Sequence, residues 1–127
     1  MPHRVGAVLY VRNLAAISAF YSAVLRQPLV YHDAYHAVLR CGAFALDIHQ
    51  VPEHELAARK ADTAREHHER AAVKLSFPVD SIARARQTAA EYGGELDRGP
   101  PRWVVEAQKI CDGRDPEGNV FQLREDD

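Results

Sequence analysis

Apolar and polar residues alternate along the first strand-like stretch of the chain, Arg4 to Val11. The alternation places apolar side chains on one face of a strand and Gly6 and Tyr10 on the other. Beyond it, apolar residues recur at a spacing that predicts an amphipathic helix. Asn13 can cap this helix and Pro28 ends it. The residues expected on its buried stripe are Leu14, Ile17, Phe20, Tyr21, Val24 and Leu25.

Three short strands are predicted after the helix: Leu29–His32, Tyr35–Cys41 and Phe44–Gln50. In the last of these, Leu46 and Ile48 alternate with Asp47 and His49. One face of that strand is therefore apolar, and the other carries a carboxylate and an imidazole. The order of elements in the first half of the chain is β-α-β-β-β.

The same order returns in the second half. An alternating strand runs from Val73 to Val79, and Asp80 or Ser81 can cap the helix that follows. Gly93 and Gly94 end that helix, because glycine adopts the left-handed conformation common after a helix C-terminus. The unit is completed by a short strand from Glu95, a strand from Trp103 to Cys111 and a final strand from Val120.

This internal repeat sets the expected architecture. Aligning Val11 with Val79 superimposes strand, cap and helix of the two halves and places Gly6 opposite Lys74. A module whose helix covers one sheet face leaves the other face free to curl around a ligand. We therefore predict an α+β fold in which two β-α-β-β-β modules form a curved mixed sheet around a cleft.

A single domain, residues 1–127, is expected. Its modules span about 4–50 and about 72–125. The segment between them, about 51–71, is predicted to contain a solvated helix and to serve as a linker or as a lid. Within it, Glu66-His67-His68-Glu69 is conspicuous. Adjacent histidines point about 100° apart on a helix and do not converge on one metal, so this cluster is interpreted as a solvated face.

The end of the chain joins a turn to a strand, in the sequence Asp115-Pro116-Glu117-Gly118-Asn119-Val120-Phe121-Gln122-Leu123. This segment resembles the closing motif of the vicinal oxygen chelate superfamily, which includes glyoxalases, bleomycin-resistance proteins and extradiol dioxygenases. The resemblance extends to Val8–Leu14, with Phe20-Tyr21 after it, and to Leu75–Asp80. It implies the duplicated fold and a homodimer, in which the modules pair either within one chain or across two chains.

Members of this family that use a divalent metal take one ligand, usually His or Glu, from each of four strands. By register, these positions fall here on Gly6, Asp47, Lys74 and Gln122. Glycine offers no ligand atom, an ammonium group repels a cation, and Gln122 is a poor ligand, so only Asp47 is well suited. His3 is a weak substitute, because its parity points to the opposite face of the strand. We therefore expect no metal of the usual family type and no cofactor.

Two hypotheses describe the place of the missing metal. Asp47 and Lys74 would face one another at the floor of the cleft, where a salt bridge between them could replace the cation. Alternatively, Lys74 extends to solvent and Asp47 is hydrated.

The remaining polar residues of the predicted cleft could orient a small polar or anionic ligand, or simply line a water-filled rim. His49 is the candidate catalytic residue, because an imidazole can act as a base near neutral pH. Aromatic residues on or near strand edges, Tyr10, Tyr31, Tyr35 and Trp103, would suit a flat organic ligand, although ordinary packing also explains each one. The expected ligand-binding residues are Tyr10, Asp47, His49, Lys74, Ser76, Trp103, Gln122 and Arg124.

The charge and cysteine content of the chain bear on its binding partners and its cellular compartment. A net charge of −2 without a basic cluster predicts binding neither to nucleic acid nor to an acidic membrane. Cys41 and Cys111 lie far apart without a CxxC motif, and residues 1–4 lead straight into a strand, so we expect a cytoplasmic protein with free thiols.

Three functions are compatible with these features. The favoured one is binding of a small molecule in the cleft of a metal-free, bleomycin-resistance-type homodimer. An enzyme of the glyoxalase or dioxygenase kind with a displaced metal site is the alternative, and a non-catalytic dimeric regulatory module is the third.

Overall fold

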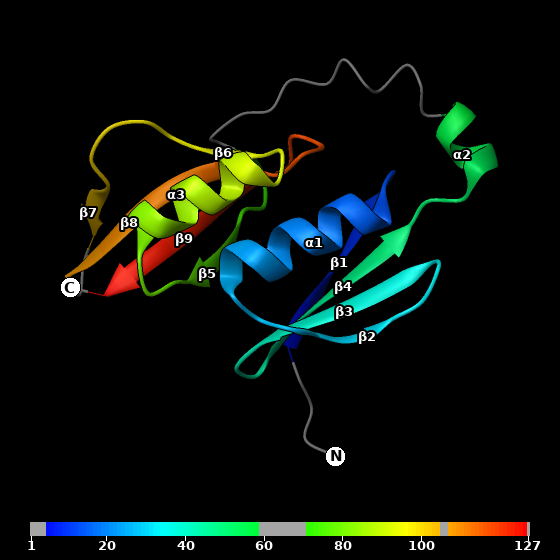
Figure 1. Ribbon diagram of the computed structural model, residues 1–127, viewed down its shortest axis with the longest axis horizontal. Helices are drawn as coiled ribbons and strands as arrows, with labels where there is room; N and C mark the ends of the chain where they lie inside the picture. The colour runs from blue at the N-terminus through cyan, green and yellow to red at the C-terminus, as the bar shows by residue number, and fades with distance from the viewer. Residues whose placement is uncertain (1–4, 59–70, 105–106, 127) are drawn as a thin grey trace.

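The computed structural model describes residues 5–58, 71–104 and 107–126 (Figure 1). The first module consists of β1 (Val5–Val11), α1 (Leu14–Leu25), β2 (Leu29–His32), β3 (His36–Cys41) and β4 (Phe44–Gln50). Its strands are ordered β1-β4-β3-β2, with β1 parallel to β4 and the other pairs antiparallel. The cap of α1 is confirmed, since the Asn13 side chain accepts a hydrogen bond from the Ala16 N–H at 3.0 Å. The predicted apolar stripe of α1 is buried in full.

The second module repeats this order. It contains β5 (Leu75–Pro78), α3 (Ile82–Glu91), β6 (Glu95–Leu96), β7 (Arg102–Val104), β8 (Gln108–Arg114) and β9 (Val120–Asp126). The sheet is ordered β5-β9-β8-β6, and β7 also pairs with β8. Because β6 and β7 are both antiparallel to β8, they take the place of one interrupted strand, equivalent to β2 of the first module.

One predicted strand is wrong. Trp103 to Cys111 was expected to be continuous, but the chain reverses between β7 and β8, which lie side by side. Ala107 adopts the left-handed conformation near this reversal, with φ of 58°. A non-glycine residue rarely adopts that conformation, so the sequence gives no turn signal there.

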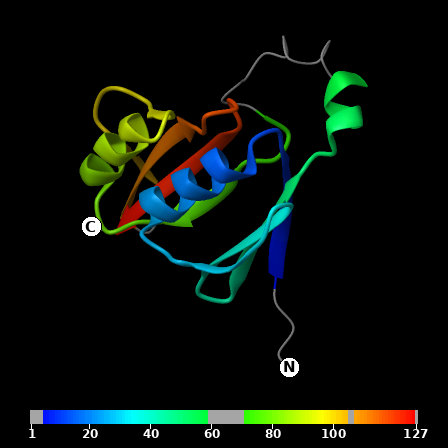
Figure 2. The same ribbon diagram turned by 45° about the vertical axis from the view of Figure 1, so that its right-hand side comes forward.

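The apolar faces of both sheets line one hydrophobic core, with α1 between them (Figures 1 and 2). The Tyr21 ring of α1 packs on Phe77 of β5 and Phe121 of β9, with centroid separations of 6.0 and 5.7 Å. Phe44 of β4 also contacts Phe77, so the two sheets meet directly. The opposite, more polar face of each sheet therefore lies on the side away from α1.

The closing turn holds the modules together. The buried Asp115 carboxylate accepts hydrogen bonds from the N–H groups of Glu117 and Asn119 and, at 2.8 Å, from the Tyr21 hydroxyl of α1. The Glu117 carboxylate in turn accepts from the Arg12 and Asn13 N–H groups at 2.9 Å. Burial, followed by the nearby Asp115 charge, raises the pKa of Tyr21 well above its usual value. The closing motif, Asp115 to Asn119, therefore has a structural role: it connects the second module to α1 and to the start of that helix.

Helix α2 (Glu53–Ala58) follows the first module and stands apart from the two sheets in both views (Figures 1 and 2). The cluster Glu66–Glu69 lies outside the described residues. Among the helices that are described, none has the length and apolar character needed to cross a membrane.

Candidate functional site

The face of the first sheet that points away from α1 carries aromatic rings, two histidines and a carboxylate. Pairing across its strands places Tyr10 of β1, His49 of β4 and His36 of β3 in one row. Val8, Asp47 and Val38 form the neighbouring row. We call this surface the open face and define it by Val8, Tyr10, Tyr31, His36, Val38, Asp47 and His49.

Four rings cross the open face in sequence. The Tyr31 and His36 centroids are 5.5 Å apart, those of His36 and His49 are 4.3 Å apart, and those of His49 and Tyr10 are 5.7 Å apart. The outer rings remain accessible, because Tyr10 is 62% and Tyr31 50% exposed. Each of the four strands contributes one ring, so the row is a shallow aromatic platform.

His36 and His49 of this row converge with Asp47 of the neighbouring row. One ring nitrogen of each histidine and one Asp47 carboxylate oxygen lie within 4.8 Å of one another, and all three residues are half-buried. Nε2 of His36 is itself buried and has no hydrogen-bond partner among the described residues. The sequence analysis named Asp47 and His49 but not His36.

The register between β3 and β4 could have identified His36. The tight turn at Gly42 and Ala43 sets Cys41 opposite Phe44. Counting back along both antiparallel strands from that pair brings His36 opposite His49.

Tyr31 and Asp33 stand at the edge of the open face. The Tyr31 hydroxyl donates a hydrogen bond to Asp33 Oδ2 at 2.5 Å. This bond raises the pKa of Tyr31 and lowers the pKa of Asp33, because the carboxylate is the charged partner that accepts it.

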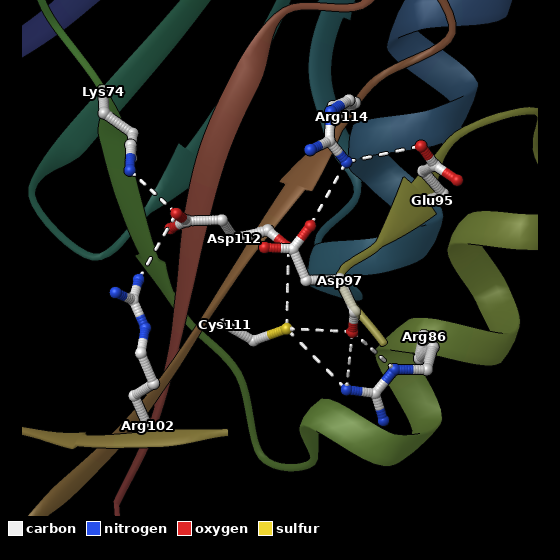
Figure 3. A network of polar contacts seen from close by, with 8 residues as sticks. All are labelled: Lys74, Arg86, Glu95, Asp97, Arg102, Cys111, Asp112 and Arg114. Carbon is white, nitrogen blue, oxygen red and sulfur yellow. Dashed lines mark hydrogen bonds and ion pairs between the residues drawn. The ribbon is translucent and has the colours of Figure 1, made fainter. Parts of the chain in front are cut away.

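The equivalent face of the second sheet is filled by charge pairs. Asp112 of β8 is only 2% exposed, and its Oδ2 is 2.9 Å from Lys74 Nζ and 3.4 Å from an Arg102 nitrogen. Figure 3 shows Lys74 and Arg102 reaching Asp112 together. The hypothesis of a salt bridge between Asp47 and Lys74 is therefore wrong. The two residues lie on different sheets whose polar faces are turned apart, and Lys74 finds its partner within its own sheet.

The other predicted polar residues of the second sheet also bind one another. The Ser76 hydroxyl donates to Gln122 Oε1 at 3.1 Å and accepts from Arg124 Nε at 2.7 Å. Arg124 donates a further hydrogen bond to Gln108. Trp103 lies on β7 opposite Lys109, and its side chain is outside the described part of the structure.

Behind this face, Cys111 projects from β8 toward α3. Its sulfur lies 3.7 Å from an Arg86 nitrogen and 3.5 Å from the Asp112 backbone carbonyl oxygen, whereas the Asp112 carboxylate points to Lys74 and Arg102 (Figure 3). Burial raises the pKa of this thiol, partly opposed by the positive charge of Arg86. Cys41 and Cys111 are both free, as predicted.

The expected ligand residues thus form two groups. Tyr10, Asp47 and His49 lie together on the open face, whereas Ser76, Gln122 and Arg124 lie in the second sheet and Lys74 directly precedes its strand β5. A separate cavity of about 560 Å³ lies between the end of α1 and the start of α3, and of the predicted ligand residues its lining includes Arg124.

The positions that the resemblance assigns to a metal do not fit one. A Cβ atom at Gly6 would lie 2.5 Å from the Ala45 carbonyl oxygen, so this backbone admits no side chain there. Lys74 is paired with Asp112, and the Gln122 amide oxygen already accepts from Ser76. Asp47 is the one suitable ligand among them.

Comparison with known proteins agrees with this fold. The family model described as "Glyoxalase-like domain" matches residues 6–124. A glyoxalase/bleomycin resistance protein/dioxygenase family enzyme from Burkholderia phytofirmans PsJN is similar in structure, with a TM-score of 0.68 and 19% identity over 94% of this chain and 95% of that chain. The fosfomycin resistance protein FosX from Listeria monocytogenes gives a TM-score of 0.67 and 14% identity over 100% and 92%. None of the curated proteins compared with the chain matches it. Identities this low establish likeness of fold alone.

Proposed function

We propose that this chain, which belongs to the glyoxalase-like domain family, binds a small planar organic molecule on the open face of its first sheet. The observation that carries the proposal is the row of four rings from Tyr31 to Tyr10. A flat ligand laid on such a platform gains stacking and apolar contact with each ring. Asp47 lies beside the row, where it can accept a hydrogen bond from the ligand.

A second copy of the chain would complete the site. Val8 lies next to the aromatic row and is 52% exposed. An exposed apolar and aromatic sheet face is typical of a protein–protein interface. Within one chain the polar faces of the two sheets are turned apart, so they can enclose a ligand only across two chains. We therefore propose a homodimer in which the Ser76, Gln122 and Arg124 surface of a partner faces the open face.

Small planar aromatics test the platform. Indole, quinoline and 2-naphthoate are titrated against the protein, and binding is followed by ligand-observed NMR and calorimetry. Tyr10→Ala and Tyr31→Ala are each expected to weaken binding about fivefold, because each removes a stacking contact worth about 1 kcal/mol. Tyr92→Ala is the matched control, since Tyr92 is an exposed tyrosine at the end of α3, on the other module.

Equal affinities for Tyr10→Ala, Tyr31→Ala and Tyr92→Ala would contradict binding on the open face. Failure of all three probes to bind the wild-type protein would contradict the choice of a planar organic ligand. Because Tyr10 and Tyr31 are exposed, their truncation leaves the core intact, and the folded state of each variant is verified by circular dichroism.

A further inference from the structure

His36, Asp47 and His49 have the composition of a transition-metal site. We propose that these three residues bind a divalent transition-metal ion, at a position displaced from the one that the family resemblance assigns. Asp47 is common to both positions, but the two histidines are not among the family positions. Two imidazoles and one carboxylate form a ligand set that suits Zn²⁺, Co²⁺ or Fe²⁺ and leaves coordination positions open.

The backbone already brings the ligands together. His36 and His49 are a directly opposed pair on antiparallel strands, and Asp47 is two residues from His49 on the same face of β4. The three ligand atoms lie within 4.8 Å of one another. An ion about 2.0–2.2 Å from each atom would require them to be about 3.5 Å apart, which small side-chain rotations can achieve.

An unsatisfied atom points to a missing ligand. Nε2 of His36 is buried without a hydrogen-bond partner among the described residues, an arrangement that costs free energy. Asp47 likewise has no hydrogen bond or ion pair among them, unlike Asp112 on the second sheet. A bound cation would give Nε2 of His36 a partner and would also bind the half-buried Asp47 carboxylate, whereas a stack of rings alone leaves Nε2 of His36 unsatisfied.

The proposed ion does not depend on the organic ligand or on a second chain, since all three ligands come from adjacent strands of one module. It would, however, occupy the middle of the ring row, between Tyr31 and Tyr10. A metal-bound position there would be open to a small molecule stacked on the outer rings.

Cobalt(II) is the probe that tests the site. The protein is freed of metal with a chelator, and Co²⁺ is added while the visible absorption spectrum is recorded; Zn²⁺ is then added in competition. One ion per chain is expected, with d–d bands that Zn²⁺ abolishes. His36→Gln and His49→Gln should each weaken Co²⁺ binding at least tenfold, and the double variant should abolish it.

Histidines elsewhere provide matched controls. His32→Gln and His54→Gln change exposed histidines of β2 and α2, and the variant H67Q/H68Q changes the paired histidines outside the described residues. All three should bind Co²⁺ as the wild type does. Loss of binding in any of them, or binding that survives the double His36 and His49 variant, would overturn the proposal, as would a wild-type protein that binds neither ion.

Asp47→Asn keeps the test decisive if a histidine variant fails to fold. The Asp47 side chain has no partner among the described residues, so its amide analogue should fold normally and bind Co²⁺ at least tenfold more weakly. Absence of a metal signal together with Tyr10-dependent binding of planar aromatics would refute the metal site alone. The converse result would refute the organic-ligand proposal alone.

Discussion

The two sheets are built on equivalent positions and carry opposite chemistry. Asp47 of β4 pairs with Val8 and Val38 on its neighbouring strands. In the second sheet, the equivalent residue Gln122 pairs with Ser76 and Asp112. A carboxylate between two valines in one module therefore corresponds to an amide between a hydroxyl and a carboxylate in the other.

The next row along the strands differs in the same way. Tyr10, His49 and His36 of the first module correspond to Pro78, Arg124 and Ile110 of the second. The first set presents three rings to the surface. The second presents one cation, the Arg124 guanidinium, which already donates hydrogen bonds to Ser76 and Gln108.

Polar groups that bind one another stabilise the fold, whereas unpartnered groups are available to a ligand. Lys74, Arg102 and Asp112 belong to the first kind, and Asp47 and Nε2 of His36 to the second. Buried polar atoms without partners are uncommon in stable proteins. Among the described residues they are Nε2 of His36 on the open face and Oδ1 of Asp112 in the second sheet. The Asp112 carboxylate is nevertheless paired with two cations through its other oxygen. The comparison supports the proposal that the first module is the one that binds a ligand.

The largest effect is expected from breaking the charge pair of the second sheet. Lys74→Met leaves the buried Asp112 carboxylate with only the more distant Arg102 nitrogen at 3.4 Å. The free energy of unfolding should fall by about 3 kcal/mol, because an uncompensated buried charge is costly. Urea denaturation of the wild type and the variant measures the difference.

A double variant separates the charge from the packing. Adding Asp112→Leu to Lys74→Met removes the stranded carboxylate and should restore most of the lost stability. If Lys74→Met alone changes stability by less than 1 kcal/mol, the second sheet gains little from its internal pairing and the contrast between the faces disappears.

Much of this fold follows from periodicity in the sequence. The stripe of α1, from Leu14 to Leu25, and the alternating strands such as Phe44–Gln50 are buried as their patterns predict. These features are local, because each depends only on which face of one helix or strand is apolar. The repeat of the two modules was predicted on the same basis.

The pairing of side chains was less predictable, because it depends on how distant elements meet. Parity assigned Lys74 correctly to a polar face, but it did not show that Asp112, two strands away, would be its partner. The packing of α1 between the sheets turned the polar faces apart, and this arrangement has no local signature in the sequence. His36 was missed although the turn at Gly42 fixes its register with His49.

An intermediate effect is expected when a charge is placed on the open face. Val8→Lys should weaken the proposed homodimer about tenfold, or about 1.4 kcal/mol, because an ammonium group within an apolar interface must lose its hydration. Sedimentation equilibrium measures the change. Val73→Lys, at another exposed valine outside the strands, should leave association unchanged. A wild-type protein that is monomeric at high concentration would show that the open face is not covered by a second copy.

The smallest effect on stability is expected at the position equivalent to Gln122. Asp47→Asn should change the free energy of unfolding of the metal-free protein by less than about 0.5 kcal/mol, because no described residue bonds the carboxylate. The same change should remove the rise in melting temperature that Zn²⁺ gives the wild type, since an ion that binds only the folded state stabilises it by mass action. Thermal unfolding with and without Zn²⁺ measures both quantities. A loss above 1 kcal/mol without metal would mean that Asp47 stabilises the fold as Asp112 does. That result would contradict the contrast between a second sheet whose polar groups stabilise the fold and a first sheet whose polar groups bind a ligand.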